Sequence, residues 1–132
     1  MLSVMERATL LIRGTVVEGD RYGRKLGFPT ANLLPFLPVQ RKHGIYAGIA
    51  VVDSRRCKAA IVIGPLLPSG EPKIEAYLLG FECDLYGKVI TLELAQYIRP
   101  WKSFATEQAL REQITKDIAE VETLVPDSAV SD

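Results

Sequence analysis

The sequence predicts an all-β domain that closes into a small barrel and ends in a single helix. Its apolar, β-branched runs are bounded by turn-forming residues, and no helical crossover is predicted between them. Near residue 106 the apolar period changes from that of a strand to that of a helix. Five or six antiparallel strands in a chain of this length favour a closed barrel, because closure removes exposed sheet edges.

The predicted strands follow one another with short loops between them. They span Leu10–Glu18, Gly44–Asp53, Lys58–Ile63, Ile74–Leu79 and Val89–Ile98. Residues 53–56 and 84–88 have the composition of hairpin loops, and Gly87 is free to take a positive φ in the second of them. The segment 28–33 is expected to be extended, because Pro29 fixes its own φ and restricts the residue before it.

The predicted helix closes the domain. Its apolar stripe consists of Leu110, Ile114, Ile118 and Val121, which would pack on the barrel. Thr106 is the expected N-cap, Glu107 suits the first turn, and Pro126 ends the helix. We therefore expect an N-terminal extension over residues 1–9, one domain over residues 10–125 and a flexible tail over residues 126–132.

Composition narrows the class of protein. The 132 residues are 48% hydrophobic, enough for one domain with its own core. The formal net charge is zero, which argues against binding to the nucleic-acid backbone. Cys57 and Cys83 are too few for a disulfide framework or a zinc site. With no apolar stretch near the roughly 20 residues of a membrane span, we expect a cytoplasmic monomer with no nucleic-acid or membrane partner.

One loop could hold phosphate groups. Gly19, Gly23 and Gly27 recur at four-residue spacing, and cations including Arg24 and Lys25 lie among them. Backbone N–H groups of such a loop can approach phosphate oxygens closely, and the cations complement their charge. The spacing matches neither the P-loop nor the dinucleotide-binding fingerprint, so an ordinary solvated loop remains the alternative.

Two neutral oxygens follow this loop. If the segment is extended, Thr30 and Asn32 point to the same side, because side chains alternate along a strand. Magnesium prefers oxygen ligands and keeps waters and substrate phosphates, so these two side chains would suffice as protein ligands. The alternative is that both side chains simply satisfy a turn.

Two carboxylates are candidates for a general base. Glu75 is predicted to share a strand face with Tyr77 and Leu79, where partial burial suits a group that accepts a proton. Glu93 lies in the same kind of context on a later strand, and either residue could be a plain surface glutamate. The pattern alone does not choose between them. His43 is the only histidine, and nothing around it supports a Ser–His–Asp site.

Several ordered blocks together resemble the riboflavin kinase family. They are Gly14–Gly19 with Gly23–Asn32, Gly44–Gly48, Asp84–Gly87 with Tyr97–Pro100, Lys102 and Phe104, and finally Gln113–Ile114 with Asp117–Ile118. The resemblance implies a six-stranded antiparallel Greek-key barrel with a C-terminal helix. It also implies transfer of the γ-phosphoryl group of ATP to the ribityl 5′-hydroxyl of riboflavin, giving FMN and ADP with Mg²⁺ as the metal.

The resemblance also assigns roles to residues. ATP and riboflavin would lie in line across the barrel mouth, with Glu75 as the general base, which resolves the choice against Glu93. Arg99, Phe104 and Asp117 would border the flavin. The ATP and phosphate contacts would be Gly19, Gly23, Arg24, Lys25, Gly27, Thr30, Asn32, Gly44 and Tyr46, with Thr30 and Asn32 also holding the metal.

The chain departs from the family pattern on the flavin side. Val62 stands where the family usually has Asn, Pro68-Ser69 stands near the place of Pro-Thr, and Trp101 replaces a frequent acidic residue. A catalytically weak flavin- or nucleotide-binding module is therefore the alternative function, and a barrel unrelated to flavins is a third. Bacterial members often carry an FMN-adenylating domain as well. Only thirteen residues precede Gly14, so we expect this chain to make FMN and not FAD.

Overall fold

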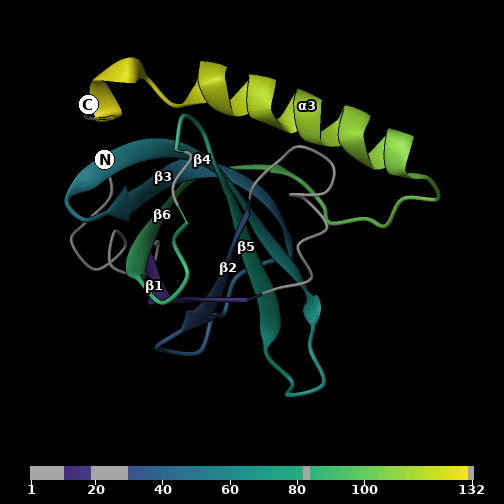
Figure 1. Cartoon of the computed structure of the whole chain (residues 1–132). Helices are drawn as coiled ribbons and strands as arrows, with labels where there is room; N and C mark the ends of the chain where they lie inside the picture. Colours follow the sequence, from purple (N-terminus) through teal and green to yellow (C-terminus); the bar gives the residue numbers. More distant parts are fainter. Residues whose placement is uncertain (1–10, 19–29, 82–83, 131–132) are drawn as a thin grey trace.

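The computed structural model describes residues 11–18, 30–81 and 84–130 (Figure 1). Its strands are β1 (Leu11–Val17), β2 (Thr30–Pro35), β3 (Gly44–Val52), β4 (Arg55–Leu66), β5 (Pro72–Leu78) and β6 (Val89–Arg99). They are followed by the helix α3 (Glu107–Leu124) and the short 3₁₀ helix η1 (Asp127–Ala129). Figure 1 shows α3 lying across one side of the barrel, and the hairpin between β4 and β5 projecting away from it.

The strands form a closed barrel in the order β1-β2-β5-β4-β3-β6. Every neighbouring pair is antiparallel. Strands β3, β4 and β5 follow one another in the sheet as in the sequence, whereas β2 lies beside β5, which is a Greek-key arrangement. The expected six-stranded antiparallel barrel with one C-terminal helix is therefore confirmed.

The barrel interior is filled by alternate residues of all six strands. Ile61, Ile63, Ile74 and Leu92 are almost completely inaccessible to solvent. Strands β3 and β6 approach closely at Gly48. A Cβ on this residue would collide with the backbone oxygen of Glu93, so glycine allows the approach. Because side chains alternate along each strand, every second one points outward. These outward side chains form the surface on which α3 and the segment before it pack.

A second apolar cluster lies outside the barrel and holds α3. Ala47 and Ala60 are fully buried on the outer face of β3 and β4, beneath Val121 of the helix. Small side chains at these positions let the helix approach the sheet closely. The helix therefore covers an apolar strip on the outer wall.

The C-terminal end of α3 is tied to β4 by cations. Lys58 Nζ donates to the Glu122 carbonyl at 3.0 Å and to Asp127 Oδ1 at 2.7 Å. The contact with Asp127 raises the pKa of Lys58 and lowers that of Asp127. Arg56 Nε donates to the Ala129 carbonyl at 3.0 Å. Residues 126–130, expected as the start of a flexible tail, thus contact β4 in this structure.

The strand boundaries differ from the sequence-based ones for local reasons. The β3–β4 turn consists of Asp53 and Ser54 alone, both with positive φ (48° and 68°), a conformation that suits a two-residue hairpin. Arg55 and Arg56, expected in the loop, therefore belong to β4. The segment expected to be extended is the strand β2, and its pairing with β1 and β5 closes the barrel.

The helix begins and ends as expected but buries a different stripe. Thr106 Oγ1 accepts a hydrogen bond from the Ala109 backbone N–H at 3.1 Å, which confirms the N-cap. The buried positions are Ile114, Asp117 and Val121, so a carboxylate replaces the expected Ile118 in the stripe. Apolar periodicity could not place Asp117, because its burial depends on a cation from another element.

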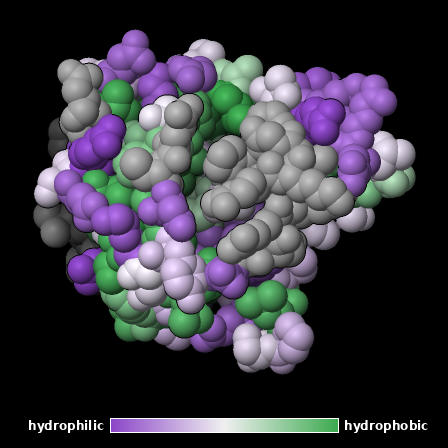
Figure 2. Space-filling view, viewed as in Figure 1, coloured by the Kyte–Doolittle hydropathy of each residue, from purple (hydrophilic) through white to green (hydrophobic). Residues whose placement is uncertain are grey.

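In this view the surface over α3 is mostly hydrophilic, whereas hydrophobic residues lie just above the pale tip of the β4–β5 hairpin (Figure 2). Leu66 and Leu67 are the exposed leucines of that hairpin. Within the described ranges, no helix has the length and apolar character needed to cross a membrane.

Candidate active site

Five outward-facing residues lie side by side across five strands. Asn32 pairs with Glu75, Glu75 with Val62, Val62 with Ile45, and Ile45 with Arg99. Directly paired residues share a face of the sheet, so these side chains form one row on the outer wall, here called the outer row. With neighbouring strands about 4.8 Å apart, the row extends roughly 19 Å from Asn32 to Arg99.

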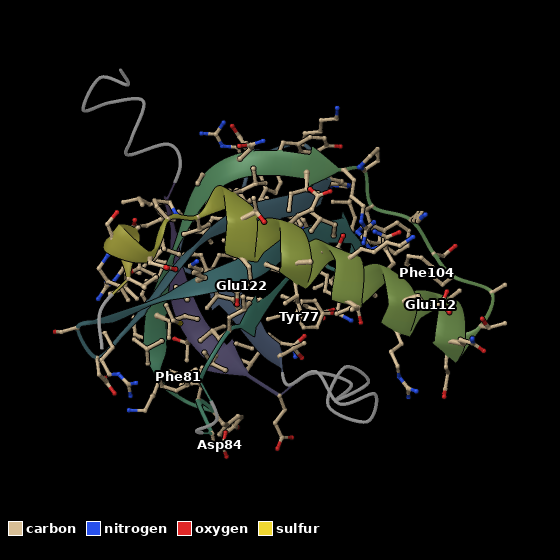
Figure 3. All side chains as sticks on the ribbon, turned by 90° about the horizontal axis from the view of Figure 1, so that it is seen from above. Tyr77, Phe81, Asp84, Phe104, Glu112 and Glu122 are labelled. Carbon is tan, nitrogen blue, oxygen red and sulfur yellow. The ribbon has the colours of Figure 1, made fainter. Side chains whose placement is uncertain are left out.

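A cleft of about 230 Å³ lies over the outer row. Its walls are the sheet, the segment 101–106 and the first half of α3. Figure 3 places Tyr77 beneath α3 and Phe104 near the start of the helix. The cleft brings together the predicted residues Glu75, Arg99, Phe104 and Asp117. The other lining residues are Ile45, Val62, Tyr77, Trp101, Lys102, Ser103, Thr106, Leu110 and Ile114.

Arg99 and Asp117 fix one end of the cleft. Arg99 Nε and Nη2 donate to the two carboxylate oxygens of Asp117 at 2.9 and 2.7 Å, and Gln113 Nε2 donates to the same carboxylate at 3.0 Å. Both members of the ion pair are largely buried. The Arg99 guanidinium carbon also lies 5.9 Å from the centre of the Phe104 ring. This paired arginine therefore joins β6, α3 and the connecting segment.

Glu75 lies in the middle part of the site. Its side chain is 17% exposed, and Oε1 is 3.0 Å from Lys73 Nζ. As expected, Ile74 and Ala76 point into the barrel core while Glu75 and Tyr77 face outward. The carboxylate thus borders the cleft on one side and Asn32 on the other.

Glu93 has a different environment. Both of its oxygens accept hydrogen bonds from Arg56, each at 2.8 Å, and Glu93 does not line the cleft. The two carboxylates that the sequence pattern left open are therefore distinguished by the structure. Glu75 adjoins the other candidate residues, and Glu93 belongs to a surface ion pair.

Thr30 and Asn32 lie on the outer face of β2, as expected from strand alternation. Between and beside them, Ala31 and Leu33 are buried in the barrel core. Thr30 pairs with Tyr77 and Asn32 with Glu75. In the described part of the chain, no group of three or more His, Cys, Asp or Glu side chains could hold a metal ion. The neutral oxygens here suit a Mg²⁺ ion that brings water and phosphate ligands of its own.

Gly44 and Tyr46 lie at the start of β3, with the Tyr46 ring on the opposite face from the outer row. That ring is buried in the core, 5.3 Å from the Tyr97 ring in an edge-to-face contact, and its hydroxyl donates to the Lys42 carbonyl at 2.6 Å. A Cβ on Gly44 would lie 2.5 Å from Tyr97 Cε2, so glycine allows this packing. The structure gives both residues a packing role.

The remaining predicted phosphate contacts, Gly19, Gly23, Arg24, Lys25 and Gly27, lie outside the described residues.

The outer row lies on the outer wall of the barrel, because the register turns these side chains away from the interior. The implied placement of ATP and riboflavin across the barrel mouth stays a prediction. Tyr77, Leu110 and Ile114 line the cleft, although sequence patterns assigned them no role in the site. They belong to elements far apart in the chain, so no local pattern could have joined them.

Comparison with known proteins identifies a family. A family model for riboflavin kinase (flavokinase) matches residues 7–125. An RNA-binding riboflavin kinase of Bacillus subtilis is 38% identical over 112 residues, covering 83% of this chain and 48% of that protein. A bifunctional riboflavin kinase/FMN adenylyltransferase of Escherichia coli K12 is 34% identical over 118 residues. The match covers 80% of this chain and 35% of that protein.

A solved structure of a riboflavin kinase resembles this fold. The crystal structure of riboflavin kinase from Trypanosoma brucei superposes with a TM-score of 0.63 at 26% identity, covering 86% of this chain and 75% of that one. The chain spans about half or less of the length of the two curated relatives above.

Replacing Asp117 with alanine should lower the free energy of unfolding by about 3 kcal/mol, because Arg99 would remain largely buried without its partner. The matched control is Lys88→Met, which removes the exposed 2.7 Å pair with Asp53 and should change stability by no more than about 1 kcal/mol. Urea unfolding of both variants measures the difference. Equal, small losses would contradict a structural role for the Arg99–Asp117 pair.

Proposed function

The chain belongs to the riboflavin kinase family, and from that premise we propose that it transfers the γ-phosphoryl group of ATP to the ribityl 5′-hydroxyl of riboflavin, giving FMN and ADP. The observation that carries the proposal is the outer row, in which Glu75 lies between Asn32 and the cleft. Phosphoryl transfer depends mainly on placing donor and acceptor in line and on stabilising charge. A row with phosphate ligands at one end and an acceptor cleft at the other supports that arrangement.

Riboflavin would occupy the cleft. Ile45 and Val62 give it an apolar floor, and Phe104 offers an aromatic face near Arg99. Its volume of about 230 Å³ lies below the roughly 300–1,000 Å³ typical of pockets that enclose a whole ligand. We therefore place the flavin ring in the cleft and direct the ribityl chain along the sheet toward Glu75.

ATP would lie on the β2 side of Glu75. Thr30 and Asn32 supply a hydroxyl and an amide oxygen on the same face, and in the sequence they follow the segment 19–27, which is predicted to bind phosphate. When bound there, Mg²⁺ would neutralise phosphate charge and orient the oxygens of ATP. The two side chains would hold the ion from the protein side.

Glu75 would act as the general base. As the riboflavin hydroxyl oxygen forms its bond to the γ-phosphorus, the hydroxyl proton passes to the Glu75 carboxylate. The bond between that phosphorus and the β–γ bridging oxygen breaks, and ADP leaves with the electron pair. Partial burial of the carboxylate and its place beside the cleft support this role.

A second function is favoured by one residue. Val62 lies in the centre of the outer row, where the family usually has Asn. An apolar side chain there offers no hydrogen bond to the polar ribityl chain, which favours a catalytically weak flavin- or nucleotide-binding module.

RNA binding is stated for the B. subtilis relative, which is about twice as long as the matched region. For this chain we propose a cytoplasmic monomer whose partners are ATP and riboflavin.

The test of the function is a product assay. The purified chain, incubated with riboflavin, ATP and Mg²⁺, should produce FMN and ADP in equal amounts, as measured by chromatography. Tight binding of unphosphorylated riboflavin, without FMN, would support the binding module instead. If the chain neither binds nor phosphorylates riboflavin, both functions are overturned.

Glu75→Gln should fold normally and lower kcat by about 10²–10⁴-fold, the usual range for a positioned base. The matched control is Glu93→Gln, which removes a carboxylate held by Arg56 away from the cleft and should leave kcat nearly unchanged. Steady-state kinetics at saturating ATP measure both. A larger loss in Glu93→Gln would show that the wrong carboxylate has been chosen.

Thr30→Val and Asn32→Ala should each raise the Mg²⁺ concentration needed for half-maximal activity, because each removes an oxygen ligand from the outer face of β2. Riboflavin binding, followed by quenching of flavin fluorescence without ATP, should be unaffected. The measurement is a magnesium titration at fixed ATP. If neither variant changes the magnesium dependence, the metal ion binds elsewhere.

A further inference from the structure

Lys73 lies two residues before Glu75 on β5, on the same outward face. Its ammonium group is 3.0 Å from Glu75 Oε1, and its side chain is 32% exposed. We propose that Lys73 binds the γ-phosphoryl group of ATP, its ammonium group moving from Glu75 to the phosphoryl oxygens when the nucleotide binds. This inference rests on the proposed kinase function, to which it adds a ligand of the transferred group.

The distances place the ammonium group within reach of the reacting atoms. A general base lies about 2.6–3.2 Å from the hydroxyl oxygen that it deprotonates, and reacting atoms in a productive complex are about 3–3.5 Å apart. The γ-phosphorus would thus lie roughly 6 Å from the Glu75 carboxylate when these contacts are added in line. Lys73 has a flexible four-carbon stem, so rotation about its terminal bonds covers this range.

The first side-chain carbon of Lys73 lies beside Gly64. A Cβ placed on Gly64 would be 3.6 Å from Lys73 Cβ and 3.6 Å from Trp101 Nε1, so the lysine and the indole both border this glycine. Glycine at position 64 leaves space beside the stem.

The described cations that line the cleft, Arg99 and Lys102, have other contacts. Arg99 is held by both oxygens of Asp117, and Lys102 Nζ lies 5.2 Å from the centre of the Phe104 ring at the flavin end. Lys73 contacts the proposed base directly. The transferred phosphoryl group carries negative charge throughout the reaction, and a cation near its oxygens stabilises the transition state.

The movement of the ammonium group also prepares the base. Before ATP binds, Lys73 occupies one oxygen of Glu75. When its charge turns to the γ-phosphoryl oxygens, that carboxylate oxygen becomes available to the riboflavin hydroxyl. Lys73 keeps its three protons throughout. The hydroxyl proton goes to Glu75, and the new oxygen–phosphorus bond replaces the bond to ADP.

The test compares two nucleotides that differ in the γ-phosphate. Titration calorimetry would measure the Kd of the Mg²⁺ complexes of the non-hydrolysable β,γ-imido analogue of ATP and of ADP. Lys73→Met should weaken binding of the analogue by about tenfold, a factor that corresponds to roughly 1.4 kcal/mol, and leave the Kd of ADP within about twofold. Lys73→Arg, which keeps the charge, should recover most of the affinity.

Matched controls separate the alternatives. Lys88→Met removes a lysine ion pair away from the cleft and should leave both Kd values unchanged. If Lys73→Met unfolds, Lys73→Gln serves for the same comparison. An equal loss for analogue and ADP, or no loss in a variant with unchanged thermal stability, would overturn the inference while FMN production by the unaltered chain still supports the kinase function. Failure of the unaltered chain to bind either nucleotide would overturn both.

Discussion

The candidate site depends on the register of the barrel strands. Asn32, Glu75, Val62, Ile45 and Arg99 meet on the outer wall because each is paired directly with the next. The same register sends the residues between them into the core. A slip of one residue in β5 would turn Glu75 into the barrel interior and expose the apolar neighbours on either side of it. The packing of the core and the placement of the proposed base are therefore set by the same contacts.

The helix makes this row into a cleft, and it is attached at two places of different character. Just past its middle, Asp117 binds Arg99 of β6, and near its end the Glu122 carbonyl accepts a hydrogen bond from Lys58 of β4. Between them Val121 packs on the small side chains of Ala47 and Ala60. Because the helix is tied to two strands that are not neighbours in the barrel, its first half is held over the outer row, where it forms one wall of the cleft.

The sequence predicted what depends on short-range pattern. Strand alternation was enough to turn Glu75 outward and to place Thr30 and Asn32 on one side, and capping preferences were enough to begin the helix at Thr106. It could not show that Asn32 lies beside Glu75, because strand order is set by contacts between distant segments. The burial of Asp117 was missed for a related reason, since apolar periodicity does not register a carboxylate whose partner is on another strand.

Two residues of the outer row, Arg99 and Glu75, form ion pairs of different character, with Asp117 and Lys73 respectively. Asp117 accepts three hydrogen bonds, two from Arg99 in a planar fork, and is nearly inaccessible to solvent. Breaking such a pair leaves a buried charge, so the flavin end of the row is expected to be rigid. The Lys73–Glu75 contact joins the ammonium group to one carboxylate oxygen at 3.0 Å, and about a third of the lysine side chain is exposed to solvent. A lysine that is partly exposed beside the proposed base suits the part of the row where, in our proposal, a substrate phosphate takes the place of the carboxylate.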